Sequence, residues 1–489
     1  MTATATVPDT TSQRTATDRG PSRAGTRSCA VALGAAAAIA TMLAGCGSAA
    51  GPARSRPASA DSSAGSRPQA YADCMRARGE TNFPNPVDGH ITLTPASRID
   101  PSSPTFQAAF EACASLAPSG PPPSAAARGT STDGQPTTAA WRSFAGWLGQ
   151  RAAAGEFSGA VLVAHHGTPL LDAGYGLADR QAGTPNTPQT KFCIASIGKL
   201  FTAVAIAQLV EQHKLSFAGT VGRYISGLPA VIADHVTIAQ LLTMTSGLDD
   251  VVLSRPNHPT TLPAMVRLIA TERPQFKPGT RFLYSNDGYI LLGAIIQKAS
   301  GESYASYLRQ HIFEPAGMTH TDVRTYAPAR VPDMAHGYTL VQPNGHPLLP
   351  TEAPATGSPS QPATLRDNST MPHIANPSGG AYSTVGDLLA FARALIQHKL
   401  VSAAMTAIIL KPRVDSPQLG GPPVDQYTYG FAYQAINGVT CVGHNGGTPG
   451  YEGQLDIYPQ NGYVVVILTN QDQVMVPAIR QTEAILTRS

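Results

Sequence analysis

The sequence predicts an α+β fold: an antiparallel sheet flanked by helices, with a helical subdomain, preceded by a small helical module held by a disulfide. Three observations predict the main part. A β-hairpin pattern stands near residue 160, a buried-strand pattern stands near residue 465, and helical patterns fill the chain between them. Strands at both ends of a region with helices between them are typical of a sheet that helices cover.

Each element has its own signal. The apolar run over 158–164, the turn His165–Thr168 and the following strand predict a hairpin. Apolar residues at helical spacing predict helices over 196–212 and about 286–299. The remaining predictions are strands over 453–458 and 463–469, a helix over 475–486, and Pro-rich, loop-like insertions over 343–378 and 411–426.

Composition excludes several function classes. Hydrophobic residues make up 42 % of the 489 residues, enough for a sizeable core. The net charge of +3 is too small to argue for nucleic acid, so no nucleic-acid partner is expected. No cysteine or histidine spacing is typical of a metal site, and we expect neither a metal nor a cofactor.

The N-terminus carries an export signal. Two arginines precede the apolar run Cys29–Ala44, which ends in Leu43-Ala44-Gly45-Cys46. A basic segment, a short apolar segment and small residues before a cut are typical of a secretory signal, here over 1–45. The final residues resemble a bacterial lipoprotein processing site, which implies that Cys46 is lipidated. The alternative is an uncleaved membrane anchor. Either way, we expect an extracytoplasmic protein attached to a membrane.

Composition divides the exported part. Residues 46–68 predict a flexible tether, 69–117 a small helical module, 118–136 a Pro-rich linker, and 137–489 the large domain. Disulfides are allowed outside the cytoplasm, so Cys74 and Cys113 are predicted to pair within the module. The function of the module is left open, with a spacer or docking role as the simplest interpretation.

Ser196 is the candidate nucleophile. Lys199 lies three residues later in the predicted helix, so both side chains lie on one face. A lysine can take the serine proton only when it is neutral, and burial lowers its pKa toward that state. Within this chain, no other lysine follows a serine at that spacing.

Two further motifs follow in the chain. Tyr284-Ser285-Asn286 offers a phenol to relay or donate a proton and an amide to hold a substrate. His444-Asn445-Gly446, followed by Gly447, stands just before the predicted strand over 453–458. Each motif is weak by itself, and the pattern at His444 also occurs at two other places in the chain. The two motifs become informative because they follow Ser196 in this order.

Together the motifs resemble the penicillin-recognising serine hydrolases: class C β-lactamases, D-alanyl-D-alanine carboxypeptidases and their esterase relatives. The resemblance spans about 150–489 and implies a β-lactamase/transpeptidase-like fold. It also rests on segments around the motifs: Leu241–Leu248, Pro278–Phe282, Pro315–Met318, Gly379–Thr384 with Asp387-Leu388, and Gly443–Gly447. One departure is Met244, where the family often has histidine, and we interpret that position as structural.

The resemblance implies a mechanism. Ser196 forms an acyl-enzyme, while Lys199 and Tyr284 share the proton transfers, with Tyr284 as base for the water that releases the acyl group. Substrate-binding roles fall to three residues: Asn286, His444 and Gly446. Protonated His444 is expected to help bind a substrate carboxylate. The backbone N–H groups of Ser196 and Gly447 are expected to form the oxyanion hole.

The function predicted is that of an exported serine hydrolase, carboxypeptidase-like and penicillin-binding, acting on a small-molecule or peptidoglycan-peptide substrate. The alternatives are an esterase or β-lactamase of the same fold, or a catalytically weak, membrane-tethered binding or sensing lipoprotein. The oligomeric state is left open. Because Cys193 and Cys441 stand three residues before Ser196 and His444, they form either a second disulfide or two buried thiols.

Overall fold

The structure is a computed structural model. It describes residues 66–85, 138–255, 257, 259–341, 364–416 and 425–487, together with residues 105, 109, 112, 113 and 116. The predicted signal segment with Cys46, the tether up to residue 65 and the linker over 118–136 lie outside these residues. The chain separates into two compact units, Met1–Pro118 and Ser119–Ser489.

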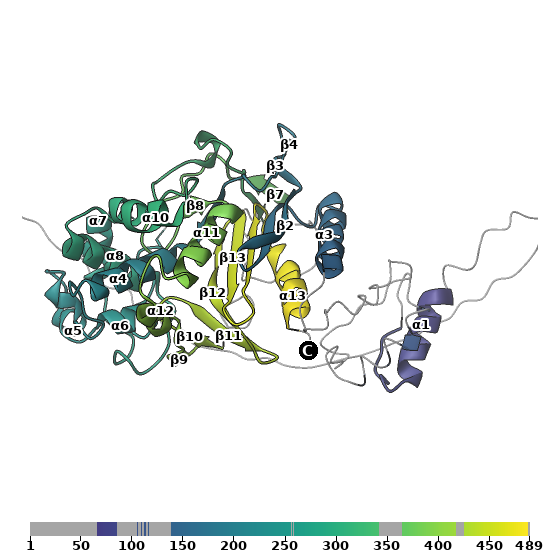
Figure 1. The fold of residues 1–489 in the computed structure, drawn as a ribbon, viewed down its shortest axis with the longest axis horizontal. Helices are drawn as coiled ribbons and strands as arrows, with labels where there is room; N and C mark the ends of the chain where they lie inside the picture. The colour runs from purple at the N-terminus through teal and green to yellow at the C-terminus, as the bar shows by residue number, and fades with distance from the viewer. Residues whose placement is uncertain are drawn as a thin grey trace, which may run out of the picture. The chain divides into compact units, whose positions relative to one another are not determined.

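The large unit is built on an antiparallel sheet (Figure 1). Its eight described strands are, in spatial order, β2 (Thr168–Tyr175), β1 (Gly159–His165), β14 (Tyr463–Thr469), β13 (Tyr451–Tyr458), β12 (Val439–Thr448), β11 (Ala432–Ile436), β10 (Gln426–Tyr427) and β9 (Val414–Asp415). The predicted hairpin and C-terminal strands are confirmed. β1 and β14, which are far apart in the sequence, pair with each other, with Gly159 opposite Thr469.

Short strand pairs flank this sheet. They are β3 (Leu177–Asp179) with β4 (Thr184–Pro185), β5 (Phe192–Ala195) with β8 (Ala381–Ser383), and β6 (Tyr338–Val341) with β7 (Thr364–Asp367). β7 lies inside the predicted insertion 343–378, and β9 and the start of β10 lie inside the predicted insertion 411–426. Those segments are therefore not loop throughout. β7 is exposed along its length, and its order comes from pairing with β6 rather than from burial.

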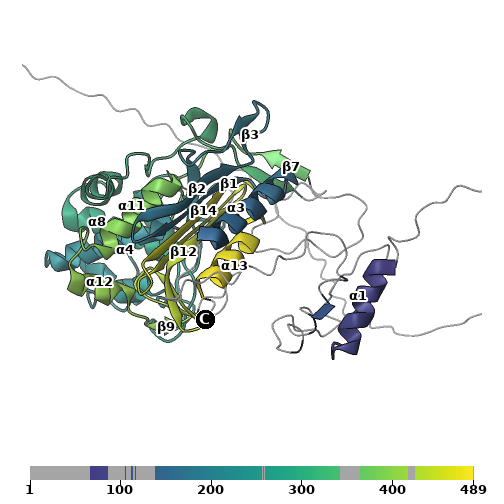
Figure 2. The ribbon, with the colours of Figure 1, turned by 45° about the vertical axis from the view of Figure 1, so that its right-hand side comes forward.

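Helices cover both faces of the sheet (Figures 1 and 2). Their bounds are α3 (Thr138–Ala153), α4 (Gly198–Glu211), α5 (Ala230–Ala233), α6 (Ile238–Leu242), α7 (Leu262–Ile269), α8 (Asn286–Ser300), α9 (Tyr304–Leu308), α10 (Glu314–Ala316), α11 (Val385–Ile396), α12 (Ala403–Leu410) and α13 (Met475–Leu486). α3 and α13 pack on one face. α11 and the helical subdomain with α4 and α8 lie on the other (Figure 2).

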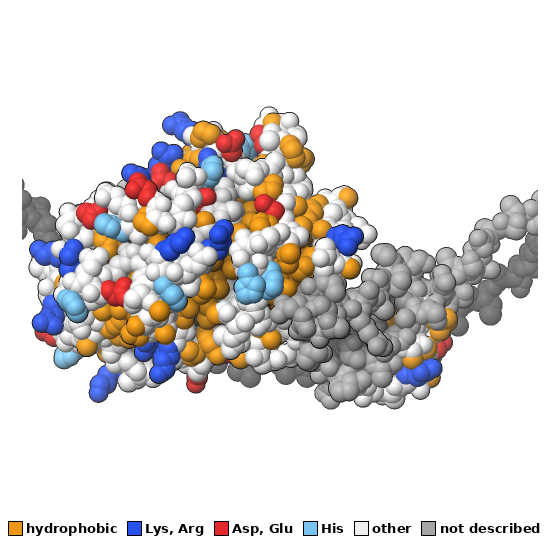
Figure 3. Space-filling model, viewed as in Figure 1, with side chains coloured by type: hydrophobic (Ala, Val, Ile, Leu, Met, Phe, Trp, Pro, Cys, Tyr) orange, Lys and Arg blue, Asp and Glu red, His pale blue; other side chains and the backbone are white. Residues whose placement is uncertain are grey.

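The strands divide their side chains between two cores. Alternate residues of a strand point to opposite faces. Leu162 and Val466 therefore join the core beneath α4 and α8, whereas Val163 and Val465 join the core beneath α3 and α13. Burial on both faces explains why β14 is a continuous apolar run rather than an alternating one. On the face that Figure 3 shows, acidic and basic side chains of this unit are interspersed, in keeping with the small net charge.

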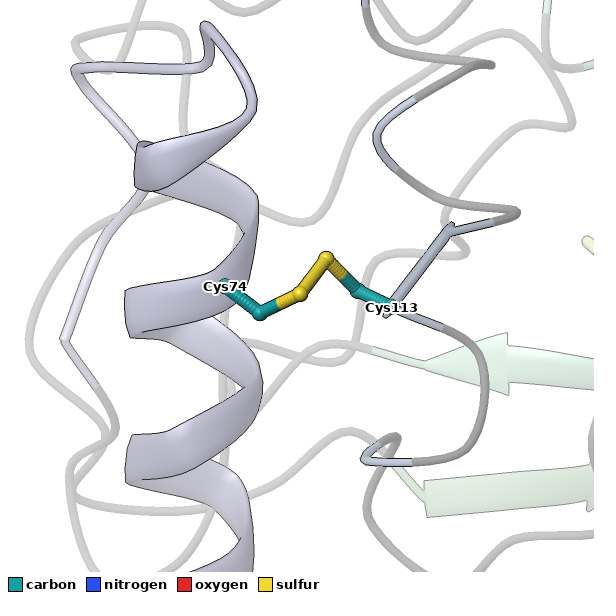
Figure 4. Close-up of a disulfide and its surroundings, with 2 residues drawn as sticks. All are labelled: Cys74 and Cys113. Carbon is teal, nitrogen blue, oxygen red and sulfur yellow. A yellow bond between two sulfur atoms is a disulfide. The ribbon is translucent and has the colours of Figure 1, made fainter.

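The small unit contains α1 (Ser66–Ala77), which begins three residues inside the predicted tether. The predicted disulfide between Cys74 and Cys113 is confirmed and joins the helix to a segment 39 residues away (Figure 4). Its described core has six members: Tyr71, Ala72, Met75, Phe83, Ala109 and Cys113. None of the helices in the described part of the chain combines the length and apolar character that crossing a bilayer requires.

Cys193 and Cys441 do not pair. Both are free thiols and both are buried, Cys193 in β5 and Cys441 in β12. Of the two interpretations of these cysteines, the structure shows the pair of small buried thiols.

Candidate active site

Ser196 lies in the tight turn between β5 and α4. Ala195, just before it, has a left-handed backbone conformation with φ of 42°, which is strained for alanine and places the serine between a strand and a helix. α4 follows at Gly198 and is buried along almost its whole length. Ser196 is itself half-buried, so a rigid and buried frame presents a hydroxyl that a substrate can reach.

Two glycines allow the backbone to close around this turn. A Cβ on Gly446 of β12 would lie 2.4 Å from the carbonyl oxygen of Ile194 and 2.9 Å from the backbone nitrogen of Ser196. A Cβ on Gly379 would lie 2.6 Å from the carbonyl oxygen of Ala195. Real side-chain carbons do not approach so closely, so glycine is required at both positions for this packing.

Lys199 lies beneath the serine. Its side chain has no exposed surface, and its Nζ lies 3.1 Å from Ser196 Oγ. Nζ also lies 2.6 Å from Asn286 Oδ1 and 2.6 Å from the carbonyl oxygen of Ser378. Burial lowers the pKa of Lys199 to about 7, and the negative charge of Asp250 opposes this shift in part. A substantial fraction of Lys199 is therefore neutral near pH 7 and able to accept the proton of Ser196.

The Ser378 carbonyl is held in place by its neighbours. The Asn376 side-chain oxygen accepts from the backbone N–H of Ser378 at 2.8 Å and from its hydroxyl at 2.6 Å. Thr202 of α4 donates to the preceding carbonyl, that of Pro377, at 2.6 Å. Sequence reasoning missed Ser378, because its contact is a backbone atom within a segment predicted to be an insertion.

Asn286 begins α8 and connects Lys199 to Asp250. Its Oδ1 accepts from Lys199, while its Nδ2 donates to Asp250 Oδ2 at 2.8 Å and its backbone N–H donates to Asp250 Oδ1. One amide hydrogen of Asn286 is left for a substrate. Sequence reasoning also missed Asp250, although the acidic pair Asp249-Asp250 directly follows Leu241–Leu248, a segment that carried the resemblance.

Tyr284 faces the nucleophile and the lysine. Lys199 Nζ lies 4.8 Å from the centre of its ring. Burial raises the pKa of Tyr284 well above its ordinary value, and its hydrogen bond to Ser196 lowers that pKa only in part. The phenol therefore carries its proton at neutral pH. This state suits a proton relay or donor and disfavours the expected role of Tyr284 as base.

His444 lies in β12, 6.3 Å from Tyr284 between ring centres. Only 3 % of its surface is exposed, and both ring nitrogens have partners. Nδ1 donates to the carbonyl oxygen of Asn445, so Nε2 accepts from the Tyr427 hydroxyl at 2.9 Å. Burial and, to a smaller extent, the positive charge of Lys199 lower the pKa of His444 to about 3. His444 is neutral at physiological pH, which differs from the protonated carboxylate ligand expected from the sequence.

The oxyanion-hole candidates meet where the pairing of β12 changes. β12 pairs with β11 only as far as Gly443, whereas residues 444–448 pair with β13, Gly447 opposite Glu452. On the β11 side, the end of β12 instead approaches the backbone of Ser196, as the close contact of Gly446 shows. Gly447 is exposed. Gly447 thus directly follows the residue that contacts the Ser196 backbone, and its place in an oxyanion hole stays a prediction.

All three sequence motifs thus converge, although they are separated by more than 240 residues between Ser196 and His444. Strand β5 and the turn after it bring Ser196 against β12, and α4 packs against α8, which begins at Asn286. Met244 joins the arrangement: its sulfur accepts from the backbone N–H of Ser285, inside the second motif. That contact agrees with a structural role for the methionine.

Comparison with known proteins agrees with this geometry. The Beta-lactamase family matches residues 144–487, so the chain belongs to the β-lactamase family. It is 31 % identical over 331 residues to penicillin-binding protein 4* of Bacillus subtilis, covering 65 % of this chain and 69 % of that protein. It is 30 % identical to the putative penicillin-binding protein PbpX of the same organism, covering 65 % and 71 % of the two chains.

Solved structures show the same fold. A penicillin-binding protein from Bacillus halodurans superimposes with a TM-score of 0.59 at 30 % identity, covering 69 % of this chain and 98 % of that one. A D-amino acid amidase from Ochrobactrum anthropi superimposes with the same TM-score at 23 % identity, covering 71 % and 97 %. The large unit therefore has the α+β, β-lactamase/transpeptidase-like fold that the sequence predicted.

Proposed function

We propose that this chain hydrolyses acyl compounds through a covalent intermediate on Ser196, with a D-alanyl peptide as the principal substrate class. The observation that carries the proposal is the pairing of Ser196 Oγ with Lys199 Nζ at 3.1 Å, in a site where burial brings the lysine pKa to about 7. Neutral Lys199 takes the proton as Ser196 attacks the carbonyl carbon, and protonated Tyr284 lies within reach to relay or donate a proton.

The acyl oxygen is expected to lie between the backbone N–H groups of Ser196 and Gly447. Each such donor typically lowers the barrier by about 2.7–4 kcal/mol. Water then releases the acyl group, with Lys199 rather than Tyr284 as the group that accepts a proton near neutral pH. The similarity to two penicillin-binding proteins at 30 % identity or more supports penicillin as a probe of this site.

Labelling with a fluorescent penicillin and a fluorophosphonate tests the acyl-enzyme. We expect one covalent adduct on the wild-type protein, mapped to the Ser196 peptide by mass spectrometry, and none on Ser196→Ala. Ser306→Ala, a change in α9 away from the site, serves as the matched control and is expected to label normally. An adduct that survives Ser196→Ala would reject the nucleophile assignment.

A second candidate is hydrolysis of neutral esters or amides, and the state of His444 favours it. A neutral histidine with both nitrogens engaged offers no positive charge to a substrate carboxylate. A turnover panel of a D-Ala-D-Ala peptide, a chromogenic cephalosporin and a short-chain nitrophenyl ester separates the candidates. Labelling without turnover of any of the three would instead favour the binding or sensing alternative.

We further propose that the protein is exported and anchored to a membrane through a lipid on Cys46. The sequence Leu43-Ala44-Gly45-Cys46 after an apolar run supports this proposal. Expression in a bacterial host with a radiolabelled fatty acid is expected to label the wild-type protein and not Cys46→Ala. Release of Cys46→Ala from the membrane fraction would support anchoring, and its unchanged retention there would contradict it.

A further inference from the structure

Asp250 approaches the catalytic lysine through a single intervening side chain. Its two carboxylate oxygens accept from the backbone N–H and from Nδ2 of Asn286, and Oδ1 of the same amide accepts from Lys199 Nζ at 2.6 Å. Asp250 is half-buried and precedes the 251–254 turn, 36 residues before Asn286 in the chain. The three side chains form one chain of charge-assisted hydrogen bonds that ends at the base.

The direction of the Asn286 amide follows from this chain. An amide side chain has a donor end and an acceptor end, and a carboxylate only accepts. Asp250 therefore requires Nδ2 on its side and leaves Oδ1 facing Lys199. Without the carboxylate, the amide is free to turn, and an NH₂ group facing the lysine would repel its N–H donors.

Asp250 is itself held in a fixed segment. The backbone N–H of Asp249 donates to Glu272 at 3.1 Å, and that of Val252 donates to Asp287 at 3.1 Å. The Ser285 hydroxyl donates to the carbonyl oxygen of Asp249 at 3.2 Å. These contacts secure the chain on both sides of Asp250, so its carboxylate is pre-positioned against the start of α8.

The charge of Asp250 acts on a lysine with few other charged neighbours. The groups that face Lys199 are the Ser196 hydroxyl, the Asn286 amide, the carbonyl oxygen of Ser378, the rings of Tyr284 and Tyr289, and neutral His444. Burial lowers the pKa of Lys199, and Asp250 opposes that shift.

We infer that Asp250 is a positioning residue for the proposed reaction: it fixes the Asn286 amide with its oxygen toward Lys199 and sets the proton affinity of that lysine. The inference deepens the proposed function and rests on it. Among the described residues, no hydrogen bond or ion pair joins Asp250 to Ser196, and Asp250 acts through Asn286.

Exchanging the acid at position 250 with the amide at position 286 gives a direct test. Asp250→Asn removes the carboxylate charge and keeps the size of the side chain. In the double variant Asp250→Asn with Asn286→Asp, an amide at 250 can again donate to a carboxylate oxygen at 286, and an acceptor again faces Lys199. Asp249→Asn is the matched control, because it removes an equal charge one residue away, from an exposed side chain that bonds Gln275 and the backbone N–H of Asp250. Asparagine keeps an oxygen for that N–H, so the backbone contact with Asp250 can be retained.

The first measurement does not depend on catalysis. Lysine labelled with ¹³C at Cε reports the titration of all seven lysines by NMR, and Lys199→Met assigns the signal. We expect the Lys199 midpoint to fall by about one pH unit in Asp250→Asn, to stay within a few tenths in Asp249→Asn, and to rise above wild type in the double variant. An unchanged midpoint in Asp250→Asn would overturn the inference.

The second measurement is the rate of Ser196 acylation by a nitrophenyl ester between pH 5 and 9. Asp250→Asn is expected to lower the plateau rate about tenfold or more and to move the acid limb to lower pH. The double variant is left out of this measurement, because Asn286→Asp also removes the amide hydrogen expected to bind substrate. Equal loss in Asp249→Asn counts against a positioning role. If the wild-type protein shows no Ser196-dependent acylation, the proposed function is rejected. The effect of Asp250 on Lys199 is still tested in that case, because the NMR titration does not require acylation.

Discussion

The two units of this chain differ in whether they bury charged side chains. The described core of the small unit contains six residues, none of them charged, and a disulfide that closes a separation of 39 residues. The large unit fully buries Lys199 and Asp287 and almost fully buries His444. Burying a charge costs several kcal/mol, and only a domain with a large apolar core tolerates that cost.

The difference teaches where stability and chemistry reside. In the small unit a covalent bond compensates for a core too small to hold the fold alone. In the large unit the apolar core stabilises the fold by enough to keep Lys199 buried, with a pKa far below the value that a lysine has in water. Four predictions sharpen or break this comparison.

The largest effect is expected from Lys199→Met. Acylation should fall about 10³-fold or more, because the base is lost. The free energy of unfolding, in contrast, should increase. The pKa of Lys199 falls from 10.5 to about 7 on folding, so the unfolded state binds more protons between these values and wild-type stability rises with pH across that window.

Below pH 7 the full cost of the buried lysine is present, on the order of 4–5 kcal/mol. Relative to wild type, Lys199→Met is therefore expected to be most stable at pH 6 and to lose that advantage as the pH approaches 10. Urea unfolding at pH 6, 8 and 9.5 measures the difference. A stability difference that does not change with pH would show that folding does not lower the pKa of Lys199.

The second prediction concerns the close contact at Gly446. Gly446→Ala is expected to lower acylation about 10²- to 10³-fold, because the new Cβ pushes β12 away from the Ser196 backbone and opens the oxyanion hole. Gly386→Ala in α11 is the control, since its Cβ would meet nothing closer than 3.9 Å. Acylation kinetics and circular dichroism of both variants are the measurements. Wild-type rates in Gly446→Ala would contradict the assigned backbone geometry.

The third prediction addresses the small unit alone. Replacing Cys74 and Cys113 with serine is expected to destabilise that unit by about 2–5 kcal/mol while leaving acylation unchanged. Limited proteolysis followed by mass spectrometry should show new cleavage between residues 66 and 116 and none within 138–487. Parallel loss of activity would mean that the two units are not independent, and the comparison between them would fail.

The smallest effect is expected at a buried acid pair in the large unit. Burial and a hydrogen bond with Asp287 raise the pKa of Glu272 to about 9, so one proton is shared between two carboxyl groups. The folded state then binds more protons than the unfolded state between pH 4.5 and 9, and stability falls as the pH rises through that window. Glu272→Gln keeps a donor to Asp287 without needing that proton.

Glu272→Gln is expected to match wild type at pH 4 and to exceed it by about 1 kcal/mol at pH 8, a figure reduced because Glu272 is partly exposed. Thermal unfolding at both pH values measures the change. Glu156→Gln, at an exposed carboxylate, is the control and should show no such pH dependence. A loss of stability at pH 8 would mean that Glu272 acts as an ionised carboxylate.

The sequence by itself determined much of this protein. Local periodicity predicted β1, α4, α8, β14 and α13 within a few residues, since amphipathic and apolar patterns report burial directly. The motifs at Ser196, Tyr284 and His444 predicted side chains that the fold brings together, and their roles in the reaction stay a prediction. The cysteine pair of the small unit was also predicted, from composition and compartment.

Only the tertiary structure decided the rest. Whether Cys193 and Cys441 pair, whether His444 is charged and which backbone carbonyl faces Lys199 all depend on long-range packing. A pKa is set by burial and by neighbours distant in the chain, such as Asp250 and Tyr427, and not by the residue's own identity. The sequence thus named the residues of the proposed reaction, and the packed core determines their protonation states.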